Sequence, residues 1–125
     1  MTLLDYNVWI ALFHASDTLH AKATSVVENI REPILLPEYV LVEVATVLSQ
    51  KAGKDIADTF LLEATANQDI EILPSSASFL HAVVEFYRAQ RNQKLSFIDY
   101  AIVYLSSQVN VVTFDNELQK ELRKK

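Results

Sequence analysis

The stretch from Leu95 to Asn116 constrains the fold most strongly, because it places one carboxylate inside an apolar helix. Every residue from 97 to 105 is apolar except Asp99. A helix that is apolar on nearly all sides is expected to be buried, and aspartate is rarely buried without a partner. Ser96 is a favoured N-cap residue, which places Asp99 in the first helical turn. The stretch therefore predicts a buried helix with an acidic side chain at its start.

The same stretch predicts that a second acid lies near Asp99. Residues 107–110 are expected to turn the chain, and Val111–Phe114 to return as a short strand. The helix would run outward for about 15 Å and the strand would return for about 13 Å. Asp115 follows this strand directly. We therefore expect Asp99 and Asp115 at the same end of the fold.

Short apolar segments alternate with helical patterns along the rest of the chain. The expected strands are Thr2–Leu4, Ile34–Leu36 and Ile70–Leu73, and the expected helices include Asn7–Phe13, Pro37–Lys51, Asp55–Asn67, Ser75–Arg91 and Glu117–Arg123. A further helix is expected between Phe13 and Pro33, capped by Ser16 or Asp17, with an apolar face from Leu19 to Ile30. This alternation is typical of α/β proteins, in which helices cover both faces of a parallel sheet. The sequence predicts a single three-layer α/β/α domain over residues 1–125, with a short parallel sheet of four or five strands.

Four acids are expected at one edge of that sheet, where parallel strands end and ligands bind in open α/β folds. Asp5 ends the first strand, and Glu43 lies in the second turn of the helix after the second strand. Asp99 and Asp115 belong to the same edge. Clustered carboxylates repel unless a cation is present, and an all-oxygen site selects Mg²⁺ or Mn²⁺. Asn7 could add an amide oxygen or orient a carboxylate.

Each acid also has a purely structural interpretation. Asp99 with Ser96 resembles a capping box, Asp115 could be an N-cap, Asp5 could be a turn residue, and Glu43 could be hydrogen-bonded locally or extend to solvent. We favour a functional site because four independent coincidences at one edge are less probable than one shared cause.

Composition excludes several classes of site. The chain has no cysteine, which rules out disulfides and thiolate metal sites. Its one glycine, Gly53, is too few for a P-loop or a dinucleotide fingerprint, and neither GxSxG nor HExxH occurs. The net charge of −5 argues against binding nucleic acid over the whole surface. No apolar stretch reaches membrane-spanning length, so we expect a soluble cytoplasmic protein.

The ordered pattern resembles the PIN domain, and most closely the compact VapC-like toxins of toxin–antitoxin pairs. The resemblance covers the whole chain and rests on four residue pairs in order, Asp5–Asn7, Pro37–Glu43, Ser96–Asp99 and Thr113–Asp115. Three positions depart from the family pattern. Tyr6 replaces a small hydroxyl residue, Glu117 replaces a frequent second aspartate, and Leu118 replaces phenylalanine.

The resemblance implies a Mg²⁺-dependent endoribonuclease, with Mn²⁺ as a substitute, in which a cation activates water for attack on phosphorus. It implies that the metal-binding and catalytic carboxylates are Asp5, Glu43, Asp99 and Asp115, with Asn7, Ser96, Thr113 and Glu117 in support. The implied partners are RNA, a cognate antitoxin and a second copy of the chain. The sequence leaves open whether Glu117 joins the metal shell.

Two further surfaces have a less specific pattern. Arg88, Arg91 and Lys94 precede Ser96 and could hold RNA phosphates, although an ordinary basic helix end explains them as well. Trp9 and Phe13 on the first helix suggest core or subunit contacts. Together with Ile10 they would present more apolar surface than one small domain readily covers, which favours a homodimer.

Two competing functions remain. The chain could be a non-catalytic PIN-like module whose acidic pocket binds an arginine of a partner protein, although all four acids are present. An aspartyl-phosphate receiver or phosphatase is disfavoured. The strand ends offer no lysine to stabilise a phosphoryl group, and the DYNVW segment lacks the second aspartate of a DxDxT motif.

Overall fold

The structure is a computed structural model that describes residues 1–124, so only the last residue of the predicted domain lies outside it. Helices and strands alternate as the sequence predicts. In chain order they are β1 (Thr2–Leu4), α1 (Tyr6–Phe13), α2 (His20–Glu28), β2 (Ile34–Pro37), α3 (Glu38–Lys51), α4 (Lys54–Ala66), β3 (Ile70–Leu73), α5 (Ala77–Arg88), α6 (Phe97–Leu105), β4 (Asn110–Val112) and α7 (Asn116–Arg123).

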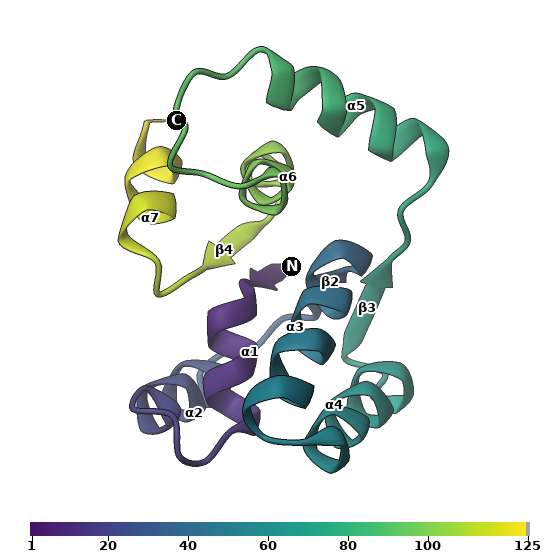
Figure 1. Cartoon of the computed structure of the whole chain (residues 1–125), viewed down its shortest axis with the longest axis vertical. Helices are drawn as coiled ribbons and strands as arrows, with labels where there is room; N and C mark the ends of the chain where they lie inside the picture. Colours follow the sequence, from purple (N-terminus) through teal and green to yellow (C-terminus); the bar gives the residue numbers. More distant parts are fainter. Residues whose placement is uncertain (125) are drawn as a thin grey trace.

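The four strands form one parallel sheet in the order β3-β2-β1-β4. Figure 1 shows helices α1–α4 on one side of this sheet and α5–α7 on the other. The prediction of a three-layer α/β/α fold with a short parallel sheet is therefore confirmed. Since all strands run the same way, the starts of α1 and α3 and the start of α7 lie at the carboxyl edge of the sheet.

Some element boundaries differ from the sequence prediction. The strand predicted at Val111–Phe114 is Asn110–Val112, because it pairs residue for residue with Thr2–Leu4. The sequence predicts Pro37 in the first turn of α3. Pro37 is instead the last residue of β2, with ψ 144°, and the N-cap residue of α3. The fifth helix is shorter than Ser75–Arg91, because Ser76 caps it by accepting a hydrogen bond from the Phe79 backbone N–H.

The first helix packs inside the domain. Trp9 and Ile10 are only 2% and 3% exposed. The Phe60 ring of α4 lies 5.5 Å from the Trp9 ring and 5.4 Å from the Phe13 ring, measured between centroids. The expectation that this cluster presents an uncovered apolar surface is therefore wrong, because α4 covers it. A homodimer stays a prediction, and it requires a different surface.

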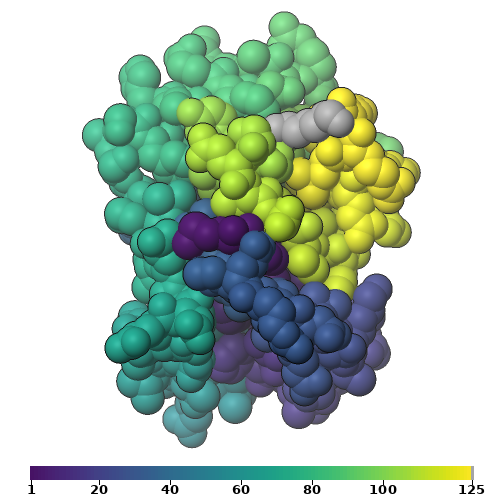
Figure 2. All heavy atoms as spheres, turned by 180° about the vertical axis from the view of Figure 1, so that it is seen from behind, coloured from purple at the N-terminus to yellow at the C-terminus, as the bar shows by residue number. Residues whose placement is uncertain are grey.

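The amino ends of the strands are joined by a polar cluster. The Glu32 carboxylate accepts hydrogen bonds from the Thr2 hydroxyl and from Asn110 Nδ2, the latter at 3.0 Å. These hydrogen bonds hold the pKa of Glu32 below its usual value. In Figure 2 the purple N-terminal segment is visible at the surface, between the blue segment before β2 and the yellow-green segment before β4. The cluster thus ties together the starts of three neighbouring strands, which fixes where they end.

No helix within residues 1–124 combines the length and the apolar character that crossing a membrane requires.

Replacing Phe60 with alanine should lower the free energy of unfolding by roughly 3–5 kcal/mol, because the substitution leaves a cavity between α1 and α4. Leu62 on the same helix is 69% exposed, so Leu62→Ala should change the stability by less than about 0.5 kcal/mol. Urea unfolding of both variants measures the difference. Equal stability of the two variants would contradict the placement of α1 in the core of a single chain.

Candidate functional site

Asp5 lies at the centre of the carboxyl edge and is 1% exposed. Its carboxylate accepts hydrogen bonds from the Tyr6 backbone N–H at 2.7 Å, from the Thr113 hydroxyl at 2.7 Å and from Asn7 Nδ2 at 3.3 Å. Burial raises the pKa of Asp5 to about 6; the Thr113 and Tyr6 hydrogen bonds oppose this shift, and nearby Asp99 and Asp115 add to it. The side chain is therefore fixed in place but costly to ionise.

Asn7 and Thr113 join the ends of β1 and β4. The Asn7 amide donates to Asp5 and to Thr113 Oγ1, and its carbonyl oxygen accepts from the Phe114 backbone N–H at 3.1 Å. Thr113 is 5% exposed, and its hydroxyl oxygen also accepts from the Asp115 backbone N–H at 3.1 Å. The two side chains orient Asp5 and fix the backbone that leads into Asp115.

Asp115 is the N-cap residue of α7, as the structural interpretation of this residue predicted. Its Oδ1 atom accepts a hydrogen bond from the Glu117 backbone N–H at 2.9 Å. Glu117 itself lies between two cations, with Oε1 at 3.8 Å from Lys94 Nζ and 3.6 Å from Lys120 Nζ. The Glu117 carboxylate thus already has charged partners in the protein.

Asp99 forms the capping box that its spacing from Ser96 predicts. Asp99 Oδ2 accepts from the Ser96 backbone N–H at 2.9 Å, and Ser96 Oγ accepts from the Asp99 backbone N–H at 3.0 Å. Asp99 is nevertheless close enough to Asp5 and Glu43 to raise the pKa of both. The local capping role therefore does not separate Asp99 from the other acids.

Glu43 is a half-buried carboxylate that forms no ion pair with the residues that the structure describes. Its Oε1 atom is buried and has no hydrogen-bond partner among residues 1–124. Burial raises the pKa of Glu43 to about 7, with further contributions from Asp5 and Asp99. A buried carboxylate oxygen without a partner is costly, so the interpretation of Glu43 as a locally satisfied side chain is not supported.

All four acids influence the same neighbour, the phenol of Tyr6. Its pKa is raised first by burial and then by the charges of Glu43, Asp5, Asp115 and Asp99. The charges of all four acids therefore act on the same side chain. Within the described part of the chain, however, no three acidic or histidine side chains are close enough together to form a metal site as they stand. The donors fit a hard divalent cation, because they are all oxygens and Glu43 offers an oxygen with no other partner.

The basic side chains near the acids are only partly those that the sequence indicated. Arg88, Arg91 and Lys94 are exposed around the end of α5, and Lys94 approaches Glu117. Sequence reasoning missed Lys22 on α2, whose ammonium nitrogen lies 5.0 Å from the centre of the Phe114 ring, next to Asp115. No local pattern could reveal Lys22, because the contact joins segments far apart in the sequence.

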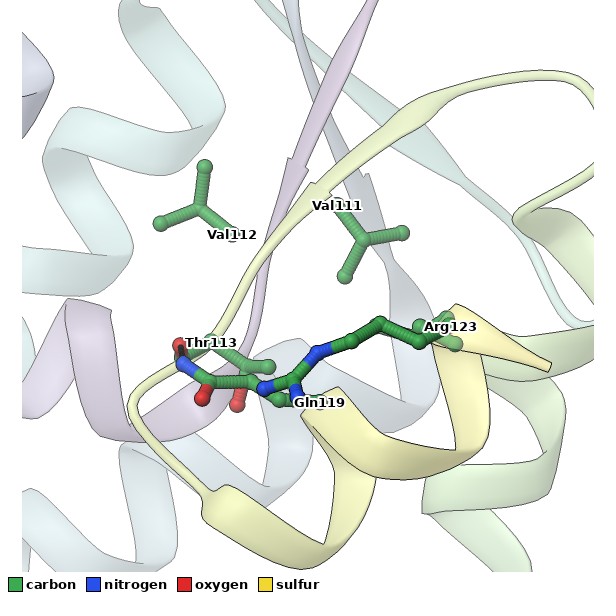
Figure 3. Close-up of a pocket in the computed structure, with 6 residues that line it drawn as sticks. Val111, Val112, Thr113, Gln119 and Arg123 are labelled. Carbon is green, nitrogen blue, oxygen red and sulfur yellow. Dashed lines mark hydrogen bonds between the residues drawn. The ribbon is translucent and has the colours of Figure 1, made fainter. Parts of the chain in front are cut away.

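A surface hollow of about 350 Å³ lies beside the site, between β4 and α7 (Figure 3). Its lining consists of Val111, Val112, Thr113, Gln119, Leu122 and Arg123. Gln119 Nε2 donates to the Thr113 carbonyl at 2.7 Å. This contact anchors α7 to the end of β4, behind the hydroxyl that holds Asp5.

Stability without a divalent cation should fall as the pH rises from about 4 to about 7. The pKa values of Asp5 and Glu43 are raised from 3.8 and 4.5 to about 6 and about 7. The folded protein therefore binds more protons than the unfolded chain in this window, and the corresponding stabilisation is lost as the carboxylates ionise. Glu43→Gln should remove part of this dependence, of order 1 kcal/mol after solvent screening.

The measurement is urea unfolding in EDTA at several pH values. Glu71→Gln is the matched control, because Glu71 is an exposed acid on β3. If the stability of the wild type changes with pH no more than that of Glu43→Gln, the raised pKa of Glu43 is contradicted.

Comparisons with known proteins agree with this geometry. The family model of the PIN domain matches residues 2–125. Among solved structures, the chain is similar to the Mycobacterium tuberculosis protein VapC20, described as a sarcin-ricin loop cleaving toxin. The TM-score is 0.85 at 18% sequence identity, and the match covers 97% of this chain and 95% of VapC20.

At this identity the likeness to VapC20 shows the fold, and the family rests on the match of the domain model. A comparison of the sequence with curated proteins found no match. The family model covers nearly the whole chain, and the shared fold is that of a VapC protein. The chain belongs to the PIN domain family.

Proposed function

We propose that the chain is a divalent-cation-dependent endoribonuclease of the VapC toxin type, with Mg²⁺ or Mn²⁺ as cofactor. The observation that carries the proposal is the convergence of four carboxylates, two of which are made costly to ionise by burial and mutual repulsion. Such an arrangement is unfavourable in a purely structural role and favourable where a cation is to be bound. The PIN family match and the VapC fold support the same conclusion.

In this proposal Asp5, Glu43, Asp99 and Asp115 hold the cation. When bound, the cation supplies positive charge that activates water and offsets negative charge on the phosphate. The protein contributes the orientation of the ligands. Asp5 is fixed by the hydrogen bond from Thr113, which directly follows β4, and Asp99 is fixed by its cap with Ser96.

Supporting residues have distinct roles in the proposal. Asn7 and Thr113 hold Asp5 in its rotamer through the hydrogen bonds described above. Glu117 keeps Lys94 and Lys120 beside the site, where they can hold RNA phosphates, rather than acting as a metal ligand. Arg88 and Arg91 extend this basic surface outward.

The partners proposed for the site follow from its charge. RNA loops or single strands are the substrate class, and a cognate antitoxin protein is the inhibitor. An arginine of the antitoxin would pair bidentately with the carboxylates in place of the cation. A homodimer is also proposed from the family resemblance.

Purified protein should cleave a folded RNA in Mg²⁺ or Mn²⁺ and lose this activity in EDTA. Asp99→Asn should lower the rate roughly 100-fold, because it removes one carboxylate that binds the cation. Glu71→Gln should cleave like the wild type, since Glu71 is an exposed acid on β3. Gel analysis of the products decides the outcome. Activity that persists in EDTA would refute the cation dependence, and a folded but inactive wild type would favour a non-catalytic binding module.

Asp99→Asn should separate stability from cation binding. The amide oxygen of asparagine can still accept the hydrogen bond from the Ser96 backbone N–H, and the substitution removes one repelling charge. In EDTA the variant should therefore melt at or above the wild-type temperature. Mg²⁺ should raise the wild-type midpoint by binding the folded state, and the variant should lose most of that rise.

Thermal melts of both proteins, with EDTA and with Mg²⁺, test this expectation. A variant that is destabilised in EDTA and still responds fully to Mg²⁺ would show that Asp99 serves only the capping box.

A further inference from the structure

Three aromatic rings in successive contact connect the helix that carries Glu43 with the protein surface. The Phe97 ring lies between two others, with its centroid 5.8 Å from the Tyr39 ring and 5.6 Å from the Tyr87 ring. These rings come from three helices, α3, α5 and α6. We call this set of three rings, Tyr39, Phe97 and Tyr87, the aromatic row.

The inner end of the aromatic row is close to Glu43, one of the proposed metal ligands, because Tyr39 and Glu43 both belong to α3. Tyr39 lies one helical turn before Glu43, and Phe97 lies in the same first turn of α6 as Asp99. Residues four apart share a helix face. Tyr39, at the inner end of the row, therefore shares a helix face with Glu43, one of the four carboxylates.

The outer end of the aromatic row is exposed. Tyr87 is 42% exposed, while Tyr39 and Phe97 are intermediate. Arg88 is the next residue along the chain, is exposed, and forms no ion pair among residues 1–124. Tyr87 is thus an exposed ring that precedes an exposed arginine in the chain and is connected through Phe97 and Tyr39 to the helix that carries Glu43. This combination matches the chemistry of single-stranded nucleic acid, in which bases stack on aromatic rings and basic side chains track the backbone.

We propose that Tyr87, supported by Phe97, forms a base-stacking subsite that holds an unpaired nucleotide of the RNA next to the phosphate to be cleaved. The inference rests on the proposed ribonuclease function and adds a substrate-positioning residue to it. Because stacking uses the π-face that every base has, the subsite selects single-stranded or looped RNA over duplex RNA. It leaves the identity of the base largely open.

The fold offers a matched control in Tyr104. Tyr104 is 38% exposed and packs against Phe79 and Phe86 in the same interface between α5 and α6. It follows Asp99 by five residues, about 7.5 Å along the helix axis and away from the acids. Substitutions at Tyr87 and Tyr104 should therefore have similar effects on folding, and only those at Tyr87 should affect RNA.

The first experiment compares cleavage of a single-stranded oligonucleotide by Tyr87→Leu, Tyr87→Phe and Tyr104→Leu. Leucine keeps an apolar side chain but lacks an aromatic ring, so Tyr87→Leu should raise KM roughly 5- to 100-fold with a smaller change in kcat. Tyr87→Phe retains the ring and should restore the wild-type KM. Tyr104→Leu should leave KM unchanged, and thermal melts should show that both leucine variants are folded.

The second experiment reads stacking directly by fluorescence. Tyr87→Trp and Tyr104→Trp each add one tryptophan to Trp9, which is 2% exposed and common to both variants. Titration with oligo(A) or oligo(U) RNA in EDTA should quench the added emission in Tyr87→Trp and leave it unchanged in Tyr104→Trp.

The outcomes separate the subsite from the enzyme. A wild type that neither cleaves nor binds RNA would refute the ribonuclease and the subsite together. A wild type that cleaves RNA, while Tyr87→Leu keeps its KM or Tyr87→Trp shows no quenching, would overturn the subsite and leave the ribonuclease intact. An equal rise in KM in Tyr87→Leu and Tyr87→Phe would also overturn the stacking subsite. It would show that Tyr87 acts through its hydroxyl group or through contact with a protein partner.

Discussion

The burial of one carboxylate, Asp5, organises this protein. A carboxylate at the centre of a sheet edge is tolerated only if its oxygens receive hydrogen bonds. Here the donors are the backbone of Tyr6, the amide of Asn7 and the hydroxyl of Thr113. Since Thr113 directly follows β4, the requirement of this single group brings the segment after β4 to the end of the N-terminal strand.

The remaining acids add electrostatic repulsion to a site in which ionising the buried Asp5 is already unfavourable. Asp99 and Asp115 each use oxygens in caps, which fix their positions by local hydrogen bonds. The buried Oε1 atom of Glu43 has no such hydrogen bond from any residue in the described range 1–124. The site is therefore held together by the fold around it, in particular by the aliphatic core and by the polar cluster at the opposite edge, and not by attraction among its own groups.

Much of this arrangement could be predicted from the sequence, because it follows from connectivity. Strand ends in a parallel sheet share an edge, so Asp5 and Asp115 could be placed together without coordinates. The spacing of Ser96 and Asp99 gave the capping box for the same reason, since it is local. What could not be predicted depends on packing between distant segments. The placement of Lys22 over Phe114 and the cover that Phe60 provides for Trp9 are of this kind. So is the aromatic row, whose three rings come from three helices.

The contact between Asp5 and Thr113 also determines when the site can exist. The two residues are separated by 108 positions in the chain, so their pairing raises the contact order of the fold and is delayed by loop closure. During synthesis Asp5 emerges from the ribosome well before Thr113, which follows it by 108 positions. A growing chain therefore lacks the hydrogen bond that orients its central carboxylate. In the proposed ribonuclease, this order of assembly leaves the cation site incomplete until the segment with Thr113 has been made and has paired with Asp5.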